Sequence, residues 1–177
     1  MTLPDEAQRR RVLTDLQVTL LVEAAAGTGK TSLIAGRVAM LLATGCAPHQ
    51  IAAITFTELA AGELSLRIRS YVASLLQGTI PQVLTLALPH GLSETQRANL
   101  IAAQSYLDEI TASTIHGFCR EIIRSYAVET YLDPGSRVID GPAADAMFES
   151  VFTRWLIALT VALIVLTAFQ TYKVFYP

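Results

Sequence analysis

Charged residues are scarce in this chain of 177 residues. Aspartate, glutamate, lysine and arginine together make up 16% of it, against about 25% in an average globular protein, while 52% of the residues are hydrophobic. A chain of this composition cannot stay solvated and extended, so intrinsic disorder is excluded. Its size allows one modest domain with a hydrophobic core and excludes a large multidomain enzyme.

Basic residues are few, and lysine is nearly absent. Thirteen Lys and Arg oppose fifteen Asp and Glu, so the net charge of -2 gives no overall positive field, and any nucleic-acid contact must be local. Lys30 and Lys173 are the two lysines, and every other basic residue is arginine. Position 30 therefore carries a compact ammonium on a flexible stem, whereas all other basic residues before residue 173 are arginines.

Two cysteines and a charged N-terminus bear on the location of the protein. Cys46 and Cys119 match no CxxC spacing, which excludes a disulfide scaffold and a CxxC metal site. The first residues, MTLPDEAQRRRVL, carry charges where a signal peptide would have its apolar segment. We therefore expect a cytoplasmic protein.

The composition changes near residue 155, where a strongly apolar stretch begins. Residues 155–172 carry no charge and are flanked by Arg154 and Lys173. At about 1.5 Å per residue they span roughly 27 Å, slightly less than the hydrocarbon core of a bilayer. We divide the chain into a body, residues 1–154, and an apolar segment, residues 155–177. The apolar segment is a membrane span, a core helix of a further domain, or a product of truncation or frameshift.

Apolar periodicity in the body alternates between strands and helices. Three short apolar runs predict strands at residues 19–22, 51–56 and 110–115. Helical periodicity follows each run, from Thr31 to Gly45, from Ala60 to Leu75 and from about Gly117 to Tyr126. Ser93 and Gln96 form a capping box for a further helix. The alternation predicts an α/β fold with a parallel sheet flanked by helices, incomplete and followed by a hydrophobic helix, with ligands at the carboxyl ends of the strands.

The turn between the first predicted strand and its helix reads AAAGTGKT, a phosphate-binding loop (P-loop) with alanine in place of the first glycine. Gly27 and Gly29 let successive backbone N–H groups face one anion. Lys30 would reach the β- and γ-phosphates, and the Thr31 hydroxyl would bind Mg²⁺, which makes these two the candidate catalytic residues. The candidate nucleotide-binding residues are Ala24, Ala25, Ala26, Gly27, Thr28, Gly29, Lys30 and Thr31. A glycine-rich turn without a ligand is the alternative.

Polar motifs also follow the second and third predicted strands. In TFTELAAGEL, residues 55–64, the hydroxyls of Thr55 and Thr57 suit contact with phosphates, although Thr57 equally suits a helix N-cap. In STIHGFC, residues 113–119, Thr114 and His116 lie at the same predicted sheet edge. An imidazole there can stack on a base or bond a phosphate, although an isolated histidine is more often a capping or packed residue.

In this order, the three motifs resemble the start of a UvrD-like superfamily 1 DNA helicase of the RecB and AddA branch, over about residues 5–155. The resemblance implies that the P-loop binds ATP and Mg²⁺, and that hydrolysis drives translocation on single-stranded DNA in repair or recombination. It places Thr55, Thr57, Thr114 and His116 towards DNA and Gln8 near the family's adenine-reading glutamine. It also implies membership of a complex of helicase and nuclease subunits.

The sequence departs from the family pattern in two respects. Leu59 stands where similar sequences often carry a basic or polar residue, which weakens the expected DNA contact. The acidic DExx motif, the water-positioning glutamine and the second RecA-like domain do not occur within these residues, so we expect ATP binding more firmly than hydrolysis. A catalytically inert, truncated P-loop protein, tethered to a membrane by residues 155–172, is the alternative. A small NTPase unrelated to DNA would need a complete catalytic set, which we do not find.

Overall fold

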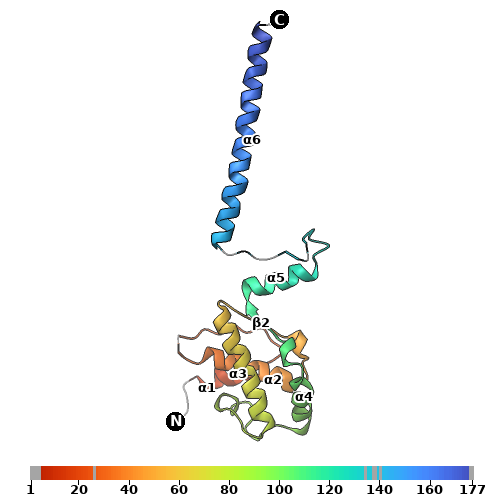
Figure 1. The fold of residues 1–177 in the computed structure, drawn as a ribbon. Coiled ribbons are helices and arrows are strands. Elements are labelled where there is room, and N and C mark those ends of the chain that lie inside the picture. The colour runs from red at the N-terminus through yellow and green to blue at the C-terminus, as the bar shows by residue number, and fades with distance from the viewer. Residues whose placement is uncertain (1–4, 26, 134, 137–138, 140, 176–177) are drawn as a thin grey trace. The chain divides into compact units, whose positions relative to one another are not determined.

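The computed structural model describes residues 5–25, 27–133, 135–136, 139 and 141–175, with side chains up to residue 167 (Figure 1). The chain divides into two units, Met1–Tyr126 and Ala127–Pro177. The elements of the first unit are α1 (Glu6–Thr14), α2 (Lys30–Ala43), η1 (Pro48–Gln50), β1 (Ala52–Thr55), α3 (Glu58–Leu76), η2 (Gln82–Leu84), α4 (Glu94–Gln104), η3 (Leu107–Glu109), β2 (Thr111–Thr114) and α5 (Ile115–Ser125). The second unit contains α6 (Gly141–Phe175).

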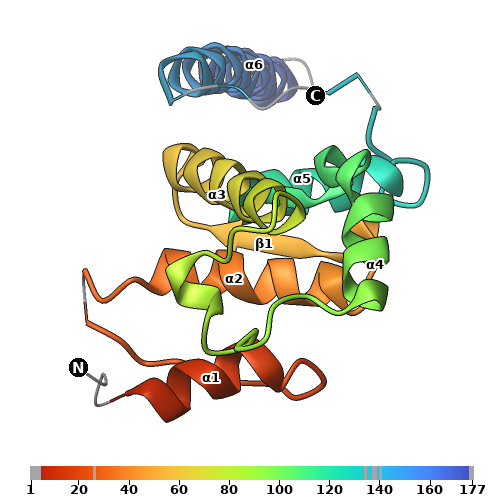
Figure 2. The ribbon, with the colours of Figure 1, turned by 90° about the horizontal axis from the view of Figure 1, so that it is seen from below.

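Strands β1 and β2 form a two-stranded parallel sheet in which Ala52 pairs with Thr111 and Thr55 pairs with Thr114. Figure 2 shows β1 between α2 and α3. Parallel strands require a crossover connection, and α3 and α4 lie in the chain between β1 and β2. The predicted α/β class is confirmed in this coarser form, as a helix-rich α/β unit with a small parallel sheet.

The predicted strand at residues 19–22 is wrong. Thr19–Val22 form no strand, and Leu21 is 89% exposed. A strand is stable only when its backbone N–H and C=O groups pair with a neighbour, and in the described sheet β1 and β2 pair with each other. Residues 19–22 are apolar, as a buried strand requires, but an apolar run forms a strand only where a neighbouring strand is available to pair with it.

The predicted helices form, and their ends follow local capping chemistry. Ser93 accepts a hydrogen bond from the Gln96 N–H at 3.2 Å, and the Gln96 side chain accepts one from the Ser93 N–H at 2.9 Å, which confirms the capping box. Gly45, with φ 95°, follows the last turn of α2. Helix α5 begins at Ile115, two residues before its predicted start, because the Thr114 hydroxyl caps it by accepting from the Gly117 N–H.

The core of the first unit surrounds α2, in which eight of 14 residues are buried. Helix α1 crosses α2 at Gly36, where an added Cβ would lie 3.0 Å from Leu13 Cδ2 and 3.2 Å from Leu84 Cδ2. The absence of a side chain at Gly36 therefore sets how closely α1 approaches α2. The largest fully buried side chains are Leu13, Leu42, Ile68, Val72, Leu75, Leu84 and Leu100.

The second unit contains the predicted hydrophobic helix, which begins at Gly141, well before residue 155. Its described apolar side chains are exposed, including Leu156, Leu159 and Ile164. Within the residues described, Gly141–Thr167 is a helix long and apolar enough to cross a membrane, by length and composition only. Within this unit, burial therefore does not account for the apolar character of the described part of α6.

We expect Gly36→Val to lower the free energy of unfolding by about 1–3 kcal/mol, because its side chain overlaps Leu13 and Leu84. Gly62→Val is the matched control, since an added Cβ at this position in α3 meets nothing within 4 Å. Its effect should stay within about 0.5 kcal/mol. Urea denaturation of the full chain followed by circular dichroism measures both, and equal losses would contradict the close approach of α1 and α2.

Candidate functional site

The P-loop leads directly into the start of α2. Gly27 has φ 77° and Gly29, the N-cap residue of α2, has φ 86°. These left-handed conformations are open to glycine and strained for most other residues. Among the described residues no side chain caps the start of α2. Its first N–H groups and the positive end of the helix dipole are therefore available to an anion.

Lys30 and Thr28 hold the described part of the loop in a closed conformation. Lys30 Nζ donates to the carbonyl oxygens of Ala24 at 2.6 Å and Ala25 at 2.9 Å. Thr28 Oγ1 donates to the Ala25 carbonyl at 2.8 Å. Lys30 is exposed, so its ammonium can exchange these neutral carbonyls for a phosphate. Thr31 follows in the first turn of α2, and Ala26 lies outside the described residues.

Gln8, which the resemblance places near the family's adenine-reading glutamine, lies beside the P-loop. Together with Ala24, Thr28 and Lys30 it lines a cavity of about 240 Å³. These residues come from α1, the P-loop and the first residue of α2. Residues that are distant in the sequence are therefore brought together here, and reading of adenine by Gln8 stays a prediction.

Arg9 is a site residue that the sequence analysis missed. Its Nη2 donates to the carbonyl of Thr28 at 3.0 Å, and its Nε donates to Asp5 Oδ2 at 2.8 Å. The hydrogen bond from Arg9 holds the pKa of Asp5 below its ordinary value, and the same bond raises the pKa of Arg9. The i, i+4 spacing of Asp5 and Arg9 was visible in the sequence, but their contact with the loop was not.

Arg9 and Thr28 also line a second cavity, of about 590 Å³. Gly29 and Ser32 of the P-loop side and Tyr71 of α3 line it as well. Arg67 of α3 donates to Ser32 Oγ at 2.6 Å, which ties the first turn of α2 to α3. Two cavities therefore adjoin Arg9 and the P-loop, and the bond from Arg67 to Ser32 connects the start of α2 to α3.

The predicted DNA-facing residues gather at the carboxyl ends of β1 and β2, and we call Thr55, Thr57, Thr114 and His116 the strand-end cluster. Thr55 and Thr114 are directly paired in the parallel register. Thr57 caps α3, because its Oγ1 accepts from the Ala60 N–H at 3.2 Å. Thr57 and His116 are exposed. The structure thus unites four residues from two motifs that are far apart in the chain, as the parallel pairing of their strands requires.

Thr114 differs from the other members of the strand-end cluster. Its side chain is 8% exposed, and its Oγ1 donates to Glu58 Oε1 at 3.0 Å while accepting from the Gly117 N–H at 3.1 Å. Both functions of the hydroxyl are therefore used inside the protein. This geometry assigns Thr114 a structural role at the junction of β2, α3 and α5, and direct contact with DNA stays a prediction.

Phe56 is the second residue that sequence reasoning missed. It lies between Thr55 and Thr57 and is 90% exposed, and Leu59 nearby is 76% exposed. The apolar run at residues 51–56 had assigned Phe56 to a strand, where alternation or burial would hide its ring. The strand ends at Thr55, so the ring stands free at the edge that carries the strand-end cluster.

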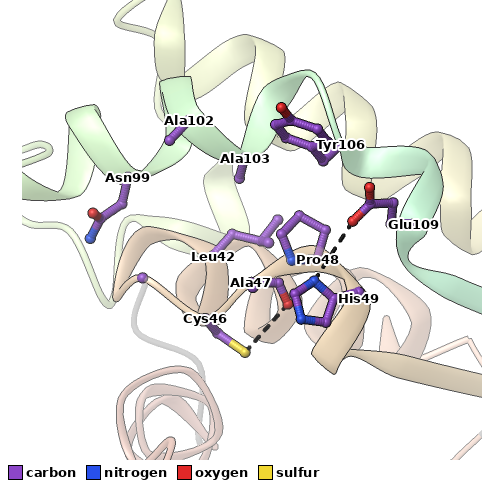
Figure 3. A pocket seen from close by; sticks show the side chains of 11 residues that line it. Leu42, Cys46, Ala47, Pro48, His49, Asn99, Ala102, Ala103, Tyr106 and Glu109 are labelled. Atoms are coloured by element: carbon purple, nitrogen blue, oxygen red, sulfur yellow. Dashed lines mark hydrogen bonds and ion pairs between the residues drawn. The ribbon is translucent and has the colours of Figure 1, made fainter.

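A further cavity of the first unit lies apart from these sites. Figure 3 shows a pocket at the far end of α2, lined by residues such as Leu42, Cys46 and Tyr106. The volume of this cavity is about 380 Å³, and His49 Nδ1 lies 3.7 Å from Glu109 Oε2 at its edge. The cavity contains none of the predicted site residues. Within the described ranges, no three His, Cys, Asp or Glu side chains are grouped to hold a metal ion.

Comparison with known proteins gives matches over most of the chain. The profile of the UvrD/REP helicase N-terminal domain matches residues 5–163. An ATP-dependent helicase/nuclease subunit of Pediococcus pentosaceus is 32% identical over 134 residues, which is 75% of this chain and 10% of that protein. The proteins of the same name from Desulforamulus reducens and Moorella thermoacetica are 31% identical over 84% of this chain and 33% identical over 79% of it. The chain spans about a tenth of the length of these curated relatives.

Substituting Thr114 tests its structural role. We expect Thr114→Val to lower the local stability of α5 by about 1–2 kcal/mol, because it removes a helix cap and leaves Glu58 without this partner. His116→Ala, two residues further on and exposed, should change it by less than about 0.5 kcal/mol. Hydrogen exchange of the α5 amides in the full chain measures both, and unchanged protection in Thr114→Val would refute the capping role.

Proposed function

The chain belongs to the family of UvrD/REP helicase N-terminal domains, and from this we propose that it forms the ATP-binding start of a DNA helicase. In this proposal Mg²⁺-ATP binds at the P-loop, and single-stranded DNA crosses the strand-end cluster. The relatives are named as subunits of an ATP-dependent helicase/nuclease, and we extend both the ATP dependence and a role beside a nuclease partner to this chain. Its site of action is then the DNA of the cytoplasm, in repair or recombination.

The start of α2 is the observation that supports nucleotide binding most directly. Left-handed Gly27 and Gly29 precede a helix N-terminus without a side-chain cap, and Lys30 is exposed beside them. This arrangement fits a polyphosphate, because backbone N–H groups and one ammonium face the same space. Lys30 would leave the carbonyls of Ala24 and Ala25 for the phosphates, and the Thr31 hydroxyl would bind the Mg²⁺ that the nucleotide brings.

The strand-end cluster and Phe56 support binding of single-stranded DNA. Thr57 and His116 offer exposed polar groups, while helices α3 and α5 begin at this edge and direct N–H groups outward. Phe56 adds an exposed ring on which a base can stack without regard to sequence. The hydroxyl of Thr114 supports the edge from inside by fixing Glu58 and the start of α5.

Helix α3 connects the two proposed sites. It begins next to the strand-end cluster, and further along it Arg67 binds Ser32 in the first turn of α2. A change at the P-loop that moves Ser32 would therefore also move α3, the helix that Thr57 caps. We propose that nucleotide binding alters the affinity for DNA by this path. The acidic residue and the arginines that complete hydrolysis come from outside these residues.

A catalytically inert, membrane-tethered P-loop protein is the second candidate. The exposed apolar side chains of α6 favour it. It differs from the first candidate in one measurable respect, because an inert remnant has no need to bind nucleotide.

Lys30→Ala tests nucleotide binding. We expect it to weaken Mg²⁺-ATP affinity by about 10- to 100-fold or abolish it, since a charged hydrogen bond to phosphate is worth about 1.5–3 kcal/mol. Lys173→Ala replaces the other lysine and is the matched control. Titration of the full chain in mild detergent with a fluorescent ATP analogue measures both. Equal binding by the two variants would exclude the P-loop as the site, and failure of the unaltered chain to bind would favour the inert remnant.

Phe56→Ala tests the DNA edge. We expect the affinity for oligo(dT) to fall by about 5- to 100-fold, because stacking of one base on an aromatic ring is worth about 1–3 kcal/mol. Phe148→Ala removes another exposed phenylalanine, in α6, and should leave affinity unchanged. Fluorescence anisotropy with labelled oligo(dT) gives both values, and a loss shared by the two variants would point to a general apolar effect.

A further inference from the structure

We propose that Arg9 is the positioning residue of the P-loop, an inference that rests on the nucleotide-binding role proposed above. Arg9 lies in α1, outside the loop, and its Nη2 donates to the carbonyl of Thr28 at 3.0 Å. Thr28 stands between the two left-handed glycines. Arg9 therefore holds the one peptide group that connects Thr28 to Gly29.

The need for such a restraint follows from the glycines themselves. In a trans peptide the carbonyl of Thr28 and the N–H of Gly29 point in opposite directions. Glycine adopts positive and negative φ with similar ease, so this peptide could turn over at little cost. Turning it over would withdraw the Gly29 N–H from the groups that face an anion. The bond from Arg9 to the Thr28 carbonyl fixes one of the two orientations.

Arg9 is itself held in place from two directions. Its Nε donates to Asp5 at 2.8 Å, so the planar guanidinium bridges a carboxylate and the loop carbonyl. The helix that carries it is anchored by Leu13, which is fully buried against Gly36 of α2. The guanidinium of Arg9 is therefore held in a defined position next to the P-loop.

The surrounding space agrees with this role. Arg9 and Thr28 both line the cavity of about 590 Å³ and the cavity of about 240 Å³, so their contact borders both spaces. The neighbouring arginines do not share this position. Arg10 is exposed, and Arg11 pairs with Asp15 at 3.1 Å.

The test compares Arg9→Ala, Arg9→Lys and Arg10→Ala in the full chain, titrated with fluorescent ATP and ADP analogues in the presence of Mg²⁺. We expect Arg9→Ala to weaken binding of both nucleotides by the same factor, about tenfold, the effect of losing one charge-assisted hydrogen bond. Arg9→Lys should recover part of the loss, because an ammonium can still donate to the Thr28 carbonyl. Arg10→Ala should bind as the unaltered chain does.

Hydrogen exchange without nucleotide supplies a readout that does not depend on binding. The amides of residues 27–30 should exchange faster in Arg9→Ala, while those in the core of α2 keep their protection. Asp5→Asn, which keeps Arg9 but removes its carboxylate partner, should give a smaller change in the same direction. Faster exchange throughout α2 would instead mean a general loss of structure and would overturn the proposal.

The outcomes separate this proposal from the one on which it rests. If the unaltered chain binds nucleotide, Lys30→Ala does not, and Arg9→Ala binds normally, the positioning role is refuted while the nucleotide site stands. If Arg9→Ala weakens ATP but not ADP, Arg9 contacts the γ-phosphate and positioning is again refuted. If the unaltered chain binds neither nucleotide, the proposed function itself fails.

Discussion

The burial of α2 is the constraint on which the rest of the first unit depends. Helices α1, α3 and α4 and the segment around η2 all contact it, and eight of its 14 residues are buried. Because the P-loop is the N-terminal extension of this helix, its direction is set by core packing. Gly36 brings α1 close enough for Gln8 and Arg9 to reach the loop. A surface loop thus takes its geometry from the interior.

The sequence predicted those parts of the fold that are determined by local chemistry. Capping at Ser93 and Thr57, the glycine after α2 and the two strands that pair with each other were all readable from residue type and periodicity. The run at residues 19–22 was not readable in this way, because a strand exists only through a partner. Apolar composition alone cannot distinguish a paired strand from an exposed segment.

The candidate sites, too, were predictable from the sequence only in part. The P-loop and the strand-end cluster followed from contiguous motifs, and their grouping at one sheet edge followed from the rule for parallel strands. Arg9 was missed because its partner is the backbone carbonyl of Thr28, and any residue could supply a carbonyl. Phe56 was missed because a pattern of apolar residues cannot say where a strand ends and a ring becomes exposed. Contacts to backbone atoms in the folded protein cannot be predicted from the pattern of side chains in the sequence.

Helix α6 of the second unit consists of two parts that differ in their side chains. The family match ends at residue 163, inside α6, so most of the helix lies within it. The acidic residues Asp145 and Glu149 lie in its second and third turns. Phe148, Phe152 and Trp155 stack in sequence along one side of the helix, with ring centroids 5.9 Å and 6.3 Å apart. Asp145 and Glu149 lie three residues before Phe148 and Phe152, on the same side of the helix, so this part of α6 carries charge among its exposed aromatic side chains. From Leu156 onward the described side chains are almost entirely apolar on every side, which a single protein face would not require. The two parts of α6 are therefore suited to different surroundings, and the change occurs close to Arg154 and Trp155.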